Sequence, residues 1–166
     1  MWYGHGLQFT GELVICETLG IKGEDIMFTS NTISLEEYHK ALEMGAIINL
    51  DDFSQIDNVK KALGGAMPEI ISFRFNPGPN HNIEYNECIG NPAEAKFGMT
   101  KAQLISAFKK CKEYGGKRFG LHNMIVTAGA DPGEVKWVNF HPPFSELPSV
   151  FFFLSHKYWN NIWWCK

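Results

Sequence analysis

Apolar and polar positions alternate along this chain in blocks that predict strands and helices in turn. Four short apolar runs have the length and the β-branched or aromatic content of buried strands. These runs are residues 26–30 (IMFTS), 46–50 (AIINL), 69–75 (EIISFRF) and 118–126 (RFGLHNMIV). Strands that are apolar along most of their length are typical of parallel sheets covered by helices. The strand pattern therefore predicts an α/β protein.

Helices are predicted in the intervals between these runs. Residues 12–19 indicate the end of a helix that Gly20 closes, because glycine accepts the left-handed backbone found after many helices. Asp52 is expected to cap a helix that continues through about Leu63. Strand and helix thus alternate along this part of the chain.

Two further helix starts carry a capping box, in which serine or threonine is followed three residues later by glutamate or glutamine. Ser34 with Glu37 predicts a helix that ends at Gly45, and Thr100 with Gln103 predicts a helix through Lys112. Both helices have an apolar face that is expected to point to the core. Its members are Leu35, Tyr38, Ala41, Leu42, Met44, Leu104, Phe108 and Cys111.

Strands joined by helical crossovers predict a parallel sheet that is either closed into a barrel or doubly wound. No predicted strand is followed by G-x-G-x-x-G or G-x-x-x-x-G-K-[ST], the glycine-rich turns by which doubly wound folds bind nucleotides. The missing turns favour the barrel, while the pattern alone fits both folds.

Composition narrows the class of protein. The chain has 166 residues, enough for one domain, and a formal charge of −3 with scattered lysines, which argues against nucleic acid as a partner. The four cysteines show no C-x-x-C spacing and no nearby paired histidines, so no metal site is expected. No apolar segment has the ~18 residues of a membrane span. We therefore expect a cytoplasmic protein with reduced thiols and no membrane partner.

Several segments in a fixed order resemble a known enzyme family. They are Gly11-Glu12-Leu13, F-T-S-N at 28–31, I-N-L-D-D at 48–52, F-R-F-N-P-G at 73–78, A-K-F-G at 95–98 and F-G-L-H at 119–122. No single segment is specific, but their order and spacing are similar to diaminopimelate decarboxylase and its ornithine and arginine decarboxylase relatives. The resemblance covers residues 11–128. It implies roughly half of a (βα)8 TIM barrel of the alanine-racemase type.

The same resemblance implies a cofactor, pyridoxal 5'-phosphate, at the carboxyl ends of the barrel strands. Residues that match family positions there are Glu12, Asn31, Arg74, His122 and Thr127. Glu12 matches an acidic residue of the cofactor pocket, where a carboxylate stabilises positive charge that develops in the reaction. Thr127 matches a serine that hydrogen-bonds the cofactor phosphate.

Most of these residues also have a purely structural interpretation. Glu12 suits a helix start, where it interacts with the helix dipole, and Asn31 suits a loop turn. A lone histidine at a strand end, such as His122, is more often structural than catalytic. Arg74 would alternate outward with Ser72 if its strand had a solvent face. The pocket interpretation is favoured for Arg74, because an arginine inside a strand requires a partner or an anion.

Other positions depart from the family pattern. Family enzymes hold the resting cofactor as a Schiff base on a lysine of the first barrel strand, and no lysine here matches it. Lys22, the first lysine, is expected to be an exposed loop residue. Gly6 stands where the family has a pocket aspartate, and Met124 where many relatives have a histidine that stacks on the cofactor ring. No catalytic residue is assigned for these reasons.

Two functions of different classes follow from the resemblance. The first is a fragment of a decarboxylase, most like the enzyme that converts meso-diaminopimelate to lysine in lysine biosynthesis, inactive by itself. The second is a non-catalytic half-barrel that binds a partner of the same family. Expected partners are a small amino-acid substrate and further copies of the chain, through exposed strand edges. Lys96 matches a family lysine near the subunit contact.

Residues 1–10 and 129–166 have no match in the family pattern. All five tryptophans lie in these two segments, and the tail also carries Phe151-Phe152-Phe153 without a helical or strand period. Such a tail suggests an altered reading frame, and an aromatic surface for a partner or a membrane is the alternative interpretation. A further hypothesis is that the tail covers an exposed strand edge.

Overall fold

A computed structural model describes residues 5–76, 78, 97–123, 150–156 and 159–164. Its strands are β1 (His5–Leu7), β2 (Ile26–Ser30), β3 (Ile47–Leu50), β4 (Ile70–Arg74), β5 (Arg118–Asn123), β6 (Val150–His156) and β7 (Trp159–Trp164). Its helices are α1 (Thr10–Thr18), α2 (Leu35–Glu43), α3 (Gln55–Ala62) and α4 (Lys101–Glu113), with a short 3-10 helix at Gly23–Asp25.

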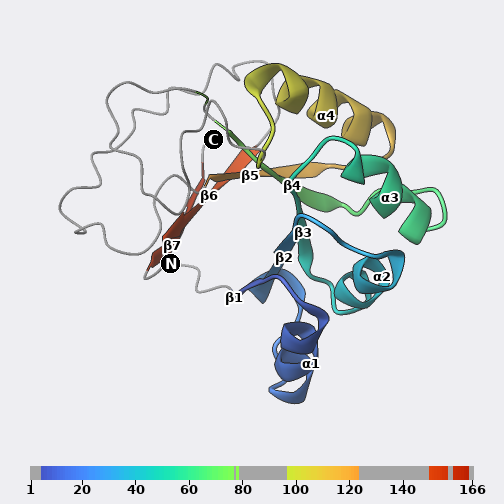
Figure 1. The fold of residues 1–166 in the computed structure, drawn as a ribbon, viewed down its shortest axis with the longest axis vertical. Helices are drawn as coiled ribbons and strands as arrows, with labels where there is room; N and C mark the ends of the chain where they lie inside the picture. Colours follow the sequence, from blue (N-terminus) through green and yellow to red (C-terminus); the bar gives the residue numbers. More distant parts are fainter. Residues whose placement is uncertain (1–4, 77, 79–96, 124–149, 157–158, 165–166) are drawn as a thin grey trace.

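The seven strands form one sheet whose spatial order follows the order along the chain (Figure 1). Strands β1 to β6 pair in parallel, and β7 is antiparallel to β6. The strand order of a doubly wound sheet reverses at a switch point, whereas this order never reverses. Helices α1 to α4 all lie on one face of the sheet (Figure 1). Both features define an arc of a (βα)8 barrel, so the barrel prediction is confirmed.

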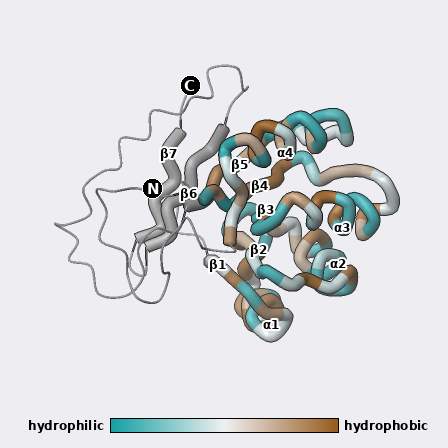
Figure 2. The backbone as a smooth tube through the Cα atoms, turned by 45° about the horizontal axis from the view of Figure 1, so that its top comes forward, coloured by the Kyte–Doolittle hydropathy of each residue, from teal (hydrophilic) through white to brown (hydrophobic). Residues whose placement is uncertain are grey.

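An apolar core fills the space between the sheet and these helices. Ile48, Leu50, Ile71 and Phe73 alternate along β3 and β4 and are fully buried in this core. The Phe108 ring of α4 meets the Phe73 ring edge to face, with 5.0 Å between the ring centroids. Figure 2 shows hydrophobic and hydrophilic segments alternating along α2, α3 and α4, as expected of helices with one buried face.

The two predicted capping boxes are confirmed. Ser34 Oγ accepts a hydrogen bond from the Glu37 backbone N–H at 3.2 Å, and Glu37 Oε2 accepts one from the Ser34 N–H at 2.8 Å. Thr100 and Gln103 make the same reciprocal pair at the start of α4. Gly45 ends α2 with a φ of +74°, which the left-handed region allows to glycine. These signals could be predicted because each acts within one helical turn.

The predicted cap of α3 is wrong. Ser54, not Asp52, occupies the N-cap position, and α3 begins at Gln55. The Asp52 carboxylate instead accepts a hydrogen bond from the Ser54 backbone N–H at 2.8 Å, two residues before the helix starts. An aspartate that bonds two residues ahead forms a turn that competes with capping.

Helix α1 differs from the other three helices because both of its faces are apolar. Leu13 and Cys16 are buried, while Ile15 and Leu19 are 59% and 68% exposed. The preceding strand β1 was not predicted, since three residues are too short to show a period. It pairs in parallel with β2, with Leu7 opposite Phe28.

The tail forms two strands, so the prediction that it has no strand structure is wrong. Strand β6 pairs in parallel with β5, from Phe119 opposite Val150 to Asn123 opposite Leu154. Strand β7 then pairs with β6. The hypothesis that the tail covers an edge of the sheet is therefore confirmed. Strand β5 is described to Asn123, so Met124 and Thr127 lie outside the described residues.

Two cysteines, Cys16 and Cys111, are free thiols in the core. Burial raises the pKa of the Cys111 thiol to about 12, which keeps it protonated and unreactive. The described residues contain no group of three or more histidine, cysteine, aspartate or glutamate side chains placed to bind a metal. Within the same residues, no helix has the length and apolar character needed to cross a membrane.

Candidate functional site

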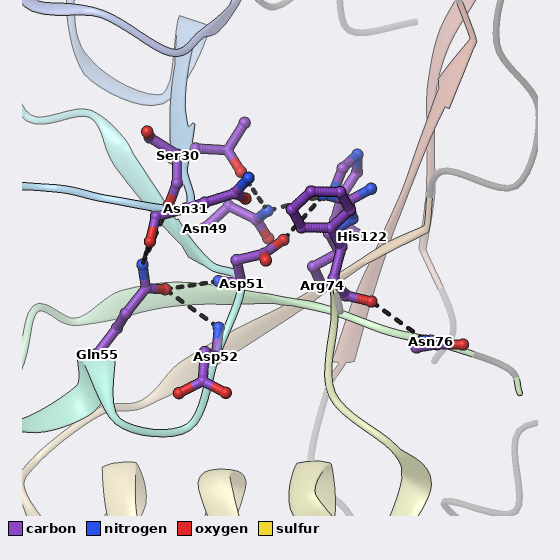
Figure 3. Close-up of polar contacts among 11 residues, drawn as sticks. Ser30, Asn31, Asn49, Asp51, Asp52, Gln55, Arg74, Asn76 and His122 are labelled. Atoms are coloured by element: carbon purple, nitrogen blue, oxygen red, sulfur yellow. Dashed lines mark hydrogen bonds and ion pairs between the residues drawn. The ribbon is translucent and has the colours of Figure 1, made fainter. Parts of the chain in front are cut away.

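Polar side chains gather where β2 to β5 end, and Figure 3 shows them converging from separate strands and loops. The strands are parallel, so their carboxyl ends meet at one edge of the sheet. Asn49 pairs with Thr29 on one side and Ser72 on the other, and Arg74 pairs with His122. These residues alternate with the core residues of their strands. They therefore point to the face opposite the helices, here called the inner face.

The centre of this group is an ion pair between Arg74, at the end of β4, and Asp51, just after β3. Arg74 Nη1 lies 2.9 Å from Asp51 Oδ1, and the two side chains are 15% and 6% exposed. The guanidinium carbon also lies 5.2 Å from the centroid of the Phe97 ring. The outward, solvated alternative for Arg74 is thus wrong. Removing either partner of such a pair leaves a buried charge uncompensated.

A second buried contact joins β3 to β5 beside this ion pair. Asn49 Nδ2 donates to Thr29 Oγ1 at 2.9 Å and lies 3.2 Å from His122 Nδ1. Burial, and next the positive charge of Arg74, lower the pKa of His122 to about 3, so the ring is neutral near pH 7. A neutral ring that accepts from the Asn49 amide at Nδ1 carries its proton on Nε2, an assignment made from the hydrogen bonds.

Gln55 fastens the loops on either side of β3. Its Oε1 accepts hydrogen bonds from the backbone N–H groups of Asp51 and Asp52 at 2.7 and 3.2 Å. Its Nε2 donates to the carbonyl oxygens of Ser30 and Asn31 at 3.1 and 3.2 Å. The buried amide therefore uses both its donors and its acceptor to hold the β2 and β3 ends together, which fixes the position of Asp51.

The structure brings together only part of the predicted site. Arg74 and His122 are neighbours, and the backbone of Asn31 is tied to the group through Gln55 while the residue itself is exposed in a bend. Glu12 accepts from the backbone N–H groups of Gln8 and Phe9 at 2.6 and 2.9 Å, which is the helix-start role. Thr127 lies outside the described residues.

Four residues of the site were not assigned from the sequence: Asn49, Asp51, Gln55 and Ser72. Asn49 and Ser72 are polar residues inside otherwise apolar strands and are fully buried. Such a residue must find a partner, so its presence in the strand was a usable signal. Asp51 carried a similar signal, as a carboxylate directly after a strand. Gln55 had none, because a glutamine at a helix start is usually exposed.

Comparisons with known proteins place this arrangement in a class. No protein-family model matches the chain. Protein TabA of Pseudomonas amygdali pv. tabaci is 38% identical over 124 residues, which are 74% of this chain and 28% of that protein. Diaminopimelate decarboxylase of Thermoplasma acidophilum is 31% identical over 146 residues, or 88% of this chain and 33% of that protein. The crystal structure of diaminopimelate decarboxylase from M. jannaschi matches 77% of this chain and 30% of its own, with a TM-score of 0.65 and 24% identity.

The chain is thus similar to part of the barrel of pyridoxal-phosphate-dependent amino-acid decarboxylases, and the resemblance predicted from the sequence is confirmed. Within that class, two curated relatives are diaminopimelate decarboxylases, from Thermoplasma acidophilum and Methanothermobacter thermautotrophicus. The chain spans between 28% and 33% of the length of the curated relatives it matches.

The described residues fit one part of a pyridoxal-phosphate site and not another. Arg74 provides a cation at the strand ends, which suits an anionic group. His122 is only 1% exposed, so its ring has no free face for stacking. Lys22 is exposed just before β2, at the opposite end of the strands. None of the described residues assigned to the site carries an amino group, so no reaction step is derived through the cofactor.

Proposed function

We propose that this chain is part of a pyridoxal-phosphate-dependent decarboxylase that acts on meso-diaminopimelate in lysine biosynthesis, and that it has no activity alone. One observation carries the proposal. The Asp51–Arg74 pair and the Asn49–His122 contact lie together at the carboxyl ends of sequential parallel strands. Active sites of barrels of this type are built at that end.

The residues of the arc would have separate roles in this site. Bound pyridoxal phosphate acts as an electron sink for the carbon that loses its carboxylate. Arg74 would orient an anionic group of the cofactor or substrate, and Asp51 would hold the guanidinium in place. Asn31 and Thr127 would donate hydrogen bonds to the phosphate, and Glu12 would stabilise positive charge. His122 would support this site from below as a neutral ring.

We further propose that the chain works in the cytoplasm as part of an oligomer, with Lys96 near the subunit contact. Its buried free thiols support a reducing compartment. The exposed apolar side chains Phe9, Val14, Ile15 and Leu19 support association with further protein.

Reduction of the purified chain with borohydride in the presence of pyridoxal phosphate tests the proposal. We expect modification spread over several exposed lysines, and no release of CO2 when meso-diaminopimelate is added. The Thermoplasma acidophilum enzyme, treated in parallel, provides the reference for modification at a single lysine. Stoichiometric modification of one lysine of this chain, together with turnover, would show that the chain is a complete enzyme.

A second candidate function is a non-catalytic half-barrel that stands alone or binds a relative. The pairing of β6 and β7 on the edge of β5 favours it, because this edge is then covered within the chain. Sedimentation and urea unfolding separate the two candidates. A compact monomer with one cooperative transition supports the half-barrel, and concentration-dependent association supports the fragment.

A further inference from the structure

Four buried side-chain atoms of the described residues have no hydrogen-bond partner in the protein: Tyr38 OH, Asn49 Oδ1, Ser72 Oγ and His122 Nε2. Buried polar groups in native proteins are nearly always paired, because an unpaired one loses its bonds to water without replacement. Several unpaired atoms at one place therefore indicate a ligand that completes their hydrogen bonds.

Three of the four atoms lie on the inner face, on the adjacent strands β3, β4 and β5. Asn49 and Ser72 are direct partners across β3 and β4, and Ser72 is the partner of Gly120 across β4 and β5. His122 follows Gly120 by two residues, so it points to the same face. The Asn49 amide reaches the His122 ring from two strands away, passing the position of Ser72 on the strand between.

These three atoms have complementary hydrogen-bonding roles. Nε2 of the neutral His122 ring is a donor, Asn49 Oδ1 is an acceptor, and the Ser72 hydroxyl is both. If the Asn49 amide were turned over, donor and acceptor would exchange between Asn49 and His122, and the set would keep one of each. None of the three groups carries a charge, and the nearby Arg74 is paired with Asp51. The ligand that fits is small, neutral, and both donor and acceptor.

We propose that Asn49 Oδ1, Ser72 Oγ and His122 Nε2 bind one ordered water molecule on the inner face of the sheet. Buried waters typically make about three hydrogen bonds to polar groups that otherwise lack partners. The water fixes the rotation of the His122 ring and the amide of Asn49. These two side chains are the layer on which Arg74 and the strand ends rest, so the water helps to position the site.

Tyr38 provides a matched control within the same protein. Its hydroxyl is also buried without a partner, but it belongs to α2 and lies in the apolar core on the helix side of the sheet. A single polar atom among apolar side chains does not hold a water, which requires two or more polar partners. The two hydroxyls should therefore respond in opposite ways when they are removed.

Stability measurements compare Ser72→Ala with Tyr38→Phe in the full chain. If Ser72 bonds a water, Ser72→Ala lowers the folding equilibrium constant about tenfold, while Tyr38→Phe leaves it equal or higher. If Ser72→Ala instead raises the constant as Tyr38→Phe does, the serine hydroxyl is unpaired and the proposal is overturned.

A direct measurement on the unmodified chain keeps the test independent of how the variants fold. Long-range proton–nitrogen NMR should show a proton on His122 Nε2 and a cross-peak from that proton to water with a long residence time. A protonated Nε2 with no water cross-peak would overturn the proposal, as would a proton on Nδ1 in place of Nε2 together with no water contact at the ring.

Discussion

The two faces of the sheet are made from alternate residues of the same strands, yet they are built on different chemistry. Toward the helices, β3 and β4 present Ile48, Leu50, Ile71 and Phe73 to a continuous apolar core. Toward the inner face, the same strands present Asn49 and Ser72, with Arg74 at the end. The first face gains stability from buried area, which has no direction, and the second depends on the geometry of individual contacts.

This difference separates what holds the fold from what makes the site. An apolar core tolerates changes of shape if volume is kept, and its loss is spread over many neighbours. A buried polar group depends on one or two partners, and losing them leaves it unpaired. Single substitutions on the two faces should therefore differ in how they couple to their neighbours as well as in size.

The largest effect is expected for Phe108→Ala on the helix side. Phe108 contacts the rings of both Phe73 and Phe119, so its removal leaves a cavity between α4 and two strands. Urea unfolding should show a loss of about 3–5 kcal/mol. Leu19→Ala, at a side chain that is 68% exposed, is the control and should change stability by less than about 0.5 kcal/mol. Equal effects of the two variants would contradict the assigned core.

The next effect concerns the ion pair of the site. Arg74→Met should cost about 3 kcal/mol, because it leaves the Asp51 carboxylate, 6% exposed, without its partner. Adding Asp51→Leu to this variant should restore part of the loss, since the unpaired charge is removed, and a double-mutant cycle measures the coupling. Lys40→Met, which breaks the exposed pair with Glu17, should cost less than about 1 kcal/mol. Additive effects of Arg74→Met and Asp51→Leu would show that the two residues do not interact.

A smaller effect should appear in the pH dependence of stability. The pKa of His122 is about 3 in the folded chain and about 6.5 in the unfolded one, so between these values only the unfolded state binds the proton. Stability is then complete above pH 6.5 and falls as the pH drops below it, by up to about 1.4 kcal/mol per pH unit.

Urea unfolding at pH 7, 6 and 5 measures this slope in the wild type and in His122→Asn, where it should be reduced. His39→Asn, at an exposed histidine of α2, is the matched control and should keep the wild-type slope. An unchanged slope in His122→Asn would mean that this ring is not buried in its neutral form.

The smallest effect is expected at a helix start. Thr100→Ala removes the hydroxyl that accepts from the Gln103 N–H, and should cost about 1 kcal/mol. Ser106→Ala, on the exposed face of the same helix, should cost less because its hydroxyl only bonds the carbonyl of Ala102. Thermal unfolding followed by circular dichroism compares the two. A larger loss for Ser106→Ala would place the start of α4 elsewhere.

The helix side of the sheet was largely predictable from the sequence, because its signals are local. The capping boxes at Ser34 and Thr100 each act over three residues, and β2 was predicted with its observed bounds. Strand β1 could not be predicted, since its three residues become a strand only by pairing with β2. The same holds for β6, whose pairing with β5 depends on residues far away in the sequence.

The inner face was predictable only in part. The sequence indicated that Arg74 needs a partner, but not that Asp51, 23 residues away, supplies it. The Asn49–His122 contact joins residues 73 apart and follows from the register of three strands, which no local pattern contains. Glu12 matched a family position, yet its carboxylate caps its own helix. Residue types at strand ends therefore predicted where the site lies, and register decided which side chains meet.

The most direct test of the account transfers this arc into a relative. Residues 5–123 of this chain would replace the matching segment of the Thermoplasma acidophilum diaminopimelate decarboxylase, and pyridoxal phosphate binding would be measured by absorbance titration. The account predicts a folded chimera that binds the cofactor, and an Arg74→Met chimera that stays folded but binds at least about tenfold more weakly. A cooperatively folded chimera that fails to bind the cofactor, or that binds equally well without Arg74, would contradict it.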